Sequence, residues 1–104
     1  MATLSVTFAA AEGAAVDLDY LQRVHRPLAL ELWGPSGLEE ITVLRGVSGT
    51  DGGKPPFLAI ALLRFSSLDH LRAALTGAHA GVLGSDIANF TNIKPVMQVN
   101  ERAE

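Results

Sequence analysis

The stretch FLAIALLRF, residues 57–65, constrains the fold most strongly, because it is apolar on both faces when read as a strand. One face carries Phe57, Ala59, Ala61, Leu63 and Phe65, and the other carries Leu58, Ile60 and Leu62. A strand of this kind needs cover on both sides of its sheet. If helices cover only one side, the other side exposes more apolar surface than soluble monomers usually tolerate.

Two sources of cover for the second face are consistent with the sequence. The economical one is a second copy of the chain packed sheet on sheet, which predicts a homodimer through the sheet face. The alternative is that the long loop GVSGTDGGKPP, residues 46–56, folds over the outer face of a central strand.

Periodicity along the rest of the chain predicts the other elements. Alternating or β-branched stretches predict strands at residues 3–9, 38–47, 57–65 and 92–100. Asp17 is a plausible N-cap for a helix from about Leu18, and SSLDHLRAAL predicts a second helix that ends at Gly77. In that second stretch, the spacing of Ser66 and Asp69 resembles a capping box. Residues 79–89 predict a shorter helical turn that is weakened by glycine.

The resulting order, β-α-β-β-α-β, predicts an α+β, ferredoxin-like subunit whose antiparallel sheet carries its helices on one face. At 104 residues, the chain is long enough for one domain over residues 1–104 and too short for two.

Composition excludes several classes of function. The chain has no cysteine, which removes thiolate catalysis, disulfides and cysteine-ligated metals. A net charge of −3 without a basic stripe argues against nucleic acid as a partner. The longest apolar run is too short to span a membrane, and the first basic residue is Arg23, so the basic start of a signal peptide is missing. We therefore expect a cytoplasmic protein.

His25 interrupts an apolar helical face. At 100° per residue it lies at the centre of the stripe formed by Leu18, Leu21, Leu28 and Leu32, which should face the sheet. Pro27 follows two residues later and predicts a kink or a restart of the helix. Such a histidine is either a core residue bonded to a backbone carbonyl or part of a site, and the position alone leaves both open.

A second polar group lies near the C-terminal end. His79 and Asp86 are seven residues apart, hence on one helical face, and Asn89 precedes the last predicted strand. The alternative for this pair is a solvated helix face. His70 lies opposite the apolar face of its own helix and should be exposed. No histidine pair has metal-binding spacing, so we expect no metal site.

The chain resembles the EthD family of the dimeric α+β barrel superfamily. The resemblance rests on YLQRVHRPL (residues 20–28), WGP (33–35), PPFLAIALLRFSSL (55–68) and SDIANFTNIKPVMQ (85–98), in this order over nearly the whole chain. It implies a homodimer whose sheets form a barrel, with a pocket between each sheet and its helices. By position Tyr20, His25, Asp86, Asn89 and Phe90 match the family's motif residues, and His79 sits where the family often has a histidine.

The resemblance implies several activities. The family takes its name from a gene needed for ethyl tert-butyl ether degradation, and its fungal relatives look like polyketide-type dehydratases. The wider superfamily includes muconolactone isomerases, cofactor-free anthrone monooxygenases and haem-degrading enzymes. Since fold alone does not choose among these, the leading hypothesis is an enzyme that acts without a cofactor on a hydrophobic, cyclic or polyketide-like molecule.

In this hypothesis the site residues have separate roles. His25 is the general acid or base, with His79 and Asp86 as the reserve pair. Tyr20 and Asn89 orient or polarise a substrate carbonyl, and Trp33, Phe90 and Leu28 form the apolar wall. The rivals are an accessory protein that binds a hydrophobic metabolite without converting it, and a haem-binding protein with His25 or His79 as axial ligand.

Overall fold

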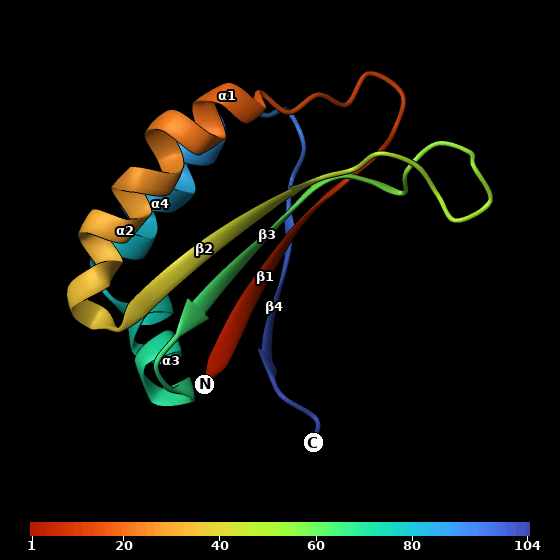
Figure 1. The fold of residues 1–104 in the computed structure, drawn as a ribbon. Helices are drawn as coiled ribbons and strands as arrows, with labels where there is room; N and C mark the ends of the chain where they lie inside the picture. The colour runs from red at the N-terminus through yellow and green to blue at the C-terminus, as the bar shows by residue number, and fades with distance from the viewer.

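In a computed structural model that describes residues 1–104, one antiparallel sheet carries every helix on the same face (Figure 1). The strands are β1 (Ala2–Ala9), β2 (Leu38–Arg45), β3 (Phe57–Phe65) and β4 (Val96–Glu101). Their order across the sheet is β2-β3-β1-β4, and all neighbours are antiparallel. This arrangement confirms the predicted α+β, ferredoxin-like fold.

The first helical segment is one continuous rod of three parts: α1 (Leu18–Tyr20), a π-helical turn η1 (Leu21–His25) and α2 (Arg26–Trp33). A short 3-10 turn, η2 (Gly34–Ser36), leads from α2 into β2. Asp17 is the predicted N-cap, because its carboxylate accepts the backbone N–H of Tyr20 at 3.0 Å.

Two further helices follow β3, namely α3 (Leu68–Thr76) and α4 (His79–Ile87). The N-cap of α3 is Ser67 rather than Ser66, since the Ser67 hydroxyl accepts the backbone N–H of His70 at 3.1 Å. The glycines of the predicted weak turn do not interrupt α4, which runs for nine residues. None of the helices combines the length and the apolar content that a membrane span requires.

The last strand begins later than the alternating pattern predicts. Residues 92–95 are held outside the sheet because Thr91 and Asn92 use their side chains to bind the segment before α1. Regular pairing with β1 therefore starts at Val96, opposite Thr7.

The hydrophobic core lies between the sheet and the helices. On β3 the buried residues are Ala59, Ala61, Leu63 and Phe65, which lie on one face of the strand as the alternation predicts. The other buried residues of the core are Ala2, Leu4, Val6, Phe8, Leu21, Ala29, Trp33, Leu38, Ile41, Leu71, Ala74, Leu83 and Phe90.

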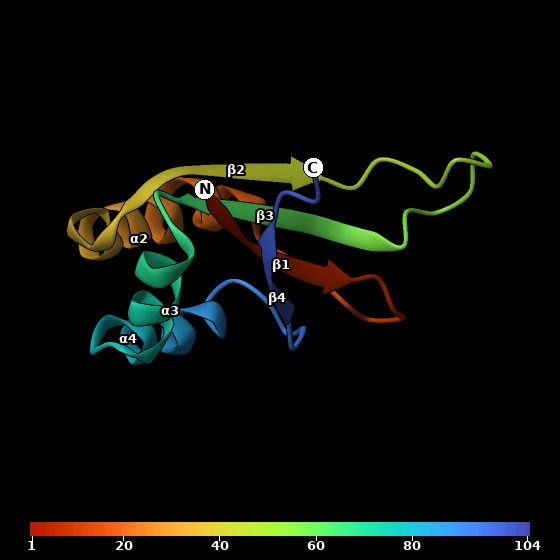
Figure 2. The same cartoon turned by 90° about the horizontal axis from the view of Figure 1, so that it is seen from below.

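The outer face of the sheet has no cover within the chain. On β3 the side chains of Leu58, Ile60 and Leu62 are half-buried, and no helix lies against them (Figure 1). The loop of residues 46–56 projects beyond the end of the sheet instead of folding back over that face (Figure 2). The loop therefore does not provide the second cover that β3 needs.

Candidate functional site

A π-helical turn places His25. The backbone N–H of Arg26 donates to the carbonyl of Leu21, five residues earlier, instead of the usual four. Pro27 has no N–H, and its ring would clash with the carbonyl of Arg23 in a regular helix. The wider turn accommodates Pro27, and the helical segment continues through this residue to Trp33. Single π turns of this kind occur frequently at functional sites.

The extra residue of η1 also rotates the helix that follows. A regular helix would turn Leu28 and Leu32 inward, whereas the structure buries Ala29 and Trp33. His25 remains on the inner side, with its side chain 16% exposed. After His25, the buried residues are therefore Ala29 and Trp33, at spacings of four. Each lies one position after the residue that a regular helix predicts.

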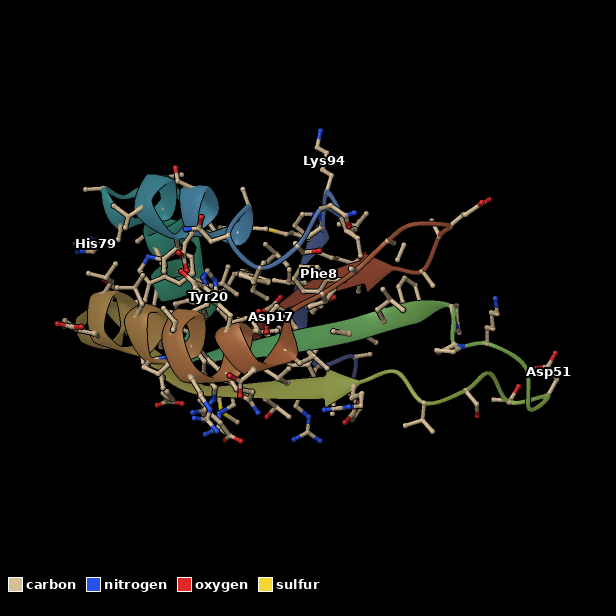
Figure 3. The ribbon with its side chains drawn as sticks, turned by 90° about the horizontal axis from the view of Figure 1, so that it is seen from above. Phe8, Asp17, Tyr20, Asp51, His79 and Lys94 are labelled. Carbon is tan, nitrogen blue, oxygen red and sulfur yellow. The ribbon has the colours of Figure 1, made fainter.

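His25 belongs to a cluster centred on the carboxylate of Asp86. The ring Nδ1 of His25 lies 2.8 Å from Asp86 Oδ2. Asp86 Oδ1 accepts the Tyr20 hydroxyl at 2.7 Å and the Asn89 amide at 3.0 Å. Tyr20 projects from the first helix toward α4, which carries Asp86 (Figure 3). Four of the predicted site residues therefore form one hydrogen-bonded group.

The segment after α4 is fastened to the segment before α1. The backbone N–H of Asp17 donates to the Phe90 carbonyl at 2.7 Å, and the Thr91 hydroxyl donates to the Ala15 carbonyl at 2.6 Å. Val16 and Thr91 also form an isolated antiparallel bridge. These bonds hold Asp86 against His25, which is 61 residues away in the sequence.

Charge and hydrogen bonding determine the protonation state of Asp86. Burial by itself would raise the pKa of Asp86, but the hydrogen bonds from Tyr20, Asn89 and His25 and the charge of His25 outweigh it and lower that pKa below its ordinary value. The same hydrogen bond to Asp86, together with burial and the nearby negative charge, raises the pKa of Tyr20. Asp86 is therefore ionised at neutral pH, and Tyr20 keeps its proton.

The ionised carboxylate fixes the tautomer of His25. A carboxylate without a proton only accepts hydrogen bonds, so Nδ1 of His25 must carry the hydrogen that lies between them. In the neutral ring, Nε2 then holds the free lone pair, and it makes no hydrogen bond within the chain. In this arrangement Nε2 is the nitrogen of His25 that can accept a proton.

The ring of His25 lies on the wall of a cavity of about 270 Å³ between the sheet and the helices. Of its 18 lining residues 15 are hydrophobic, and the others are His25, Arg26 and Gly84. The ring of Phe90 lies 4.9 Å from that of His25, and it also meets the edge of the Phe8 ring at 5.9 Å, centroid to centroid. The cavity can therefore hold an apolar molecule against the imidazole.

Two of the three predicted wall residues line this cavity. Trp33 and Phe90 do so, but Leu28 does not, because the π turn brings Ala29 to the wall in its place. The indole N–H of Trp33 is buried without a partner in the chain, so Trp33 contributes apolar area here.

The predicted polar residues are distributed differently from the expectation. Tyr20 and Asn89 do not line the cavity. The Tyr20 hydroxyl and the Asn89 amide each donate a hydrogen bond to Asp86 instead. His79 is exposed at the outer end of α4, points away from Tyr20 and makes no hydrogen bond to Asp86 (Figure 3). Asp86 thus pairs with His25, not with the histidine on its own helix. His70 is exposed, as predicted.

The same placement bears on metals and haem. No group of three or more His, Asp or Glu side chains lies close enough together to hold a metal ion. Of the two histidines considered as axial ligands of a haem, only His25 lies on the cavity wall.

Arg26 is a charged residue of the lining that the sequence did not indicate as part of the site. Its Nε donates to the carbonyl of Ile41 on β2 at 3.1 Å, which anchors the helix to the edge of the sheet. The feature of the sequence that could have indicated Arg26 is its position between His25 and Pro27, the proline that requires the wider turn.

Similar proteins were found among solved structures. An EthD-like protein from Ralstonia eutropha is 31% identical, covers 99% of this chain and 92% of its own, and superposes with a TM-score of 0.88. An EthD-family protein from Bacillus halodurans is 19% identical over 98% of each chain, with a TM-score of 0.74. A dimeric ferredoxin-like protein from Jannaschia sp. is 15% identical over 97% of this chain and 98% of its own, with a TM-score of 0.65. No family model and no curated protein matches the sequence.

Proposed function

The chain belongs to the EthD family, and from its site we propose that it is a cofactor-independent enzyme that moves a proton on a hydrophobic, cyclic or polyketide-like molecule. Dehydration, isomerisation and cofactor-free oxygenation all begin with such a step. The observation that carries the proposal is that His25 lines an apolar cavity while its Nδ1 lies 2.8 Å from the carboxylate of Asp86, which leaves Nε2 as the nitrogen available for proton transfer.

In this mechanism His25 is the catalytic base. Nε2 takes a proton from a carbon or hydroxyl of the bound substrate, and the imidazolium that forms is stabilised by the ionised Asp86 behind it. Because the wall around the ring is apolar, water competes poorly for Nε2. Tyr20 and Asn89 are positioning residues, since they fix the orientation of the Asp86 carboxylate rather than contact substrate.

A generic proton-transfer probe tests the proposal without knowledge of the natural substrate. In 5-nitrobenzisoxazole a base removes the carbon-bound proton of the five-membered ring, the N–O bond breaks, and a coloured cyanophenolate is released. We expect the wild-type protein to accelerate this reaction over buffer, and His25→Asn to lower the rate by on the order of 10²-fold or more. His70→Asn is the matched control, because His70 is exposed and outside the cavity.

Two results would reject this assignment. If His25→Asn kept the wild-type rate, His25 would not be the base. If His79→Asn lost the rate instead, the reserve pair of His79 and Asp86 would take its place.

The alternative is a protein that binds a hydrophobic metabolite without converting it. The observation in its favour is that Tyr20 and Asn89, the two candidates for polarising a carbonyl, are both bonded to Asp86. A bound apolar compound recovered unchanged after long incubation, with no acceleration of the probe reaction, would favour this alternative.

We also propose that the chain is a homodimer through the outer face of its sheet. Leu58, Ile60 and Leu62 lie on this face with Leu44, which is 45% exposed, and nothing in the chain covers them. A dimeric ferredoxin-like protein is among the structures with the same fold. A stable interface buries about 800 Å² on each subunit, which is a large part of such a sheet face.

Light scattering of a charged variant tests the dimer. Leu62→Arg should give monomers or aggregates, because it places an unpaired charge in the interface. Val82→Arg is the matched control, since Val82 is 52% exposed on α4, away from the sheet. A wild-type monomer mass that does not change with concentration would reject the proposal.

A further inference from the structure

The cavity lining has two basic side chains, and they come from consecutive residues. His25 and Arg26 carry the hydrogen-bonding groups of the lining together with the indole N–H of Trp33, and the other residues are apolar or Gly84. The proposed mechanism uses the imidazole alone. Arg26 is therefore a basic residue that lines an apolar pocket and has no role in that mechanism.

The environment of Arg26 leaves part of its guanidinium free. Nε is occupied by the Ile41 carbonyl at 3.1 Å, whereas the two terminal nitrogens make no hydrogen bond within the chain. Every ion pair of the structure involves another basic residue, so no carboxylate lies within 4.0 Å of Arg26. Arg26 is half-buried, where a charge without a counter-ion is unfavourable.

The negative charge of the hydrogen-bonded cluster, Asp86, forms no ion pair with Arg26. Asp86 already accepts hydrogen bonds from Tyr20, His25 and Asn89 and pairs with His25. The bond from Nε to the sheet also restrains the guanidinium, so the two free nitrogens are presented in a fixed plane. A planar pair of donors of this kind matches the two oxygens of a carboxylate or a similar oxyanion.

We propose that Arg26 binds an anionic group of the ligand, so that the pocket takes an amphipathic acid with an apolar body and a carboxylate or similar oxyanion. This inference rests on the proposed use of the cavity as a ligand site and specifies the class of ligand. The apolar body fills the space between Phe90, Trp33 and the sheet, and the oxyanion lies at Arg26.

A pair of fluorescent probes that differ by one anionic group tests the proposal. 1-Anilinonaphthalene-8-sulfonate carries a sulfonate, and N-phenyl-1-naphthylamine has the same aromatic body without it. Trp33 is the single tryptophan of the chain, so energy transfer from Trp33 to the probe reports binding to the chain, and the effect of the Arg26 variants reports whether the anionic group lies in the pocket. Affinities are measured by titration of the wild type, Arg26→Gln, Arg26→Lys and Arg23→Gln.

We expect Arg26→Gln to weaken binding of the sulfonate by on the order of 10- to 100-fold, as for the loss of hydrogen bonds to a charged group, and to leave the neutral probe within about twofold. Arg26→Lys, which keeps the charge but loses the planar pair, should recover part of the loss. Arg23→Gln is the matched control, because Arg23 is 79% exposed and pairs with Asp19 at 2.9 Å.

The failures of this inference and of the proposed function are distinguishable. If Arg26→Gln changed both probes equally, or neither, the role of Arg26 would be rejected while the cavity remained a ligand site. If neither probe bound the wild type in the range of Trp33, the use of the cavity would be rejected, and the proposed function with it.

Discussion

Asp86→Asn is the change that tests the site most directly, because it alters one atom of the central carboxylate. With the side-chain oxygen kept toward Tyr20 and Asn89, the new amide nitrogen faces Nδ1 of His25. An amide nitrogen only donates, so Nδ1 must become the acceptor and the ring hydrogen moves to Nε2. The variant should therefore fold with the inverted tautomer and present no lone pair to the cavity.

The hydrogen bonds of the site set the cost to stability. The bonds from Tyr20 and Asn89 remain but lose their ionised acceptor, which weakens each of them. Asn89 is exposed, and water replaces part of its loss. The bond to His25 forms again in the opposite direction. We expect the free energy of unfolding to fall by about 1–2 kcal/mol, whereas the rate of proton transfer falls by on the order of 10²- to 10⁴-fold.

Two measurements separate these effects. Long-range proton–nitrogen NMR correlations distinguish the protonated from the unprotonated nitrogen of a neutral imidazole and give the tautomer directly. Urea unfolding at pH 7 gives the change in stability. Asp51→Asn is the control, because Asp51 lies at the tip of the projecting loop (Figure 3) and should leave the His25 signals unchanged.

One result would refute the reasoning. If Asp86→Asn kept the hydrogen on Nδ1 and the lone pair on Nε2, the carboxylate would not set the tautomer. A loss of activity in that variant would then need another explanation.

Further predictions concern pH, the glycines and the aromatic wall. Hydrogen bonds outweigh burial and lower the pKa of Asp86, so the ionised carboxylate contributes fully to stability above about pH 5, and this contribution is lost as the pH falls through the lower pKa of the folded state. The difference in unfolding free energy between wild type and Asp86→Asn should therefore shrink on acidification, and a constant difference would contradict this. Gly81→Ala should raise stability by about 0.5–1 kcal/mol in chemical denaturation, since no atom lies within 4 Å of the added carbon on α4. Gly37→Ala should lower stability by more than about 1 kcal/mol, because Gly37 has φ +103° and the added carbon would lie 2.9 Å from His70 Cβ. Phe90→Ala should cost about 3–5 kcal/mol in the same assay and Phe90→Leu distinctly less, because Phe90 is 4% exposed among the rings of Phe8, Tyr20 and His25; equal losses would contradict the packing argument.

Most of the fold could be predicted from local patterns. The two apolar faces of β3 indicated both the core face and the uncovered face, since strand alternation follows from backbone geometry alone. The start of β4 could not be predicted in the same way. It depends on the side-chain bonds that Thr91 and Asn92 make to residues about 77 positions earlier.

Most members of the candidate site could be predicted, but their pairing could not. His25 was correctly expected on the inner helix face, but the regular 100° projection assigned Leu28 to the wall instead of Ala29, because it contains no π turn. The partner of Asp86 was sought on its own helix at His79. The actual partner, His25, lies on another helix, and no spacing within a single segment reveals a contact between two segments.

The π turn has a consequence for how ligand preference can change within such a scaffold. His25 and Arg26 are joined by a peptide bond, so backbone geometry limits how far apart the base and the cation can move, and substitutions elsewhere leave that span nearly constant. The cavity is also lined by Ala61 on β3 and by Ala80 and Gly84 on α4, which are small enough for larger residues to take their place. Relatives that differ at these wall positions would then bind the same reactive end of a ligand and differ in the length of the apolar end that they accept, one methyl group at a time.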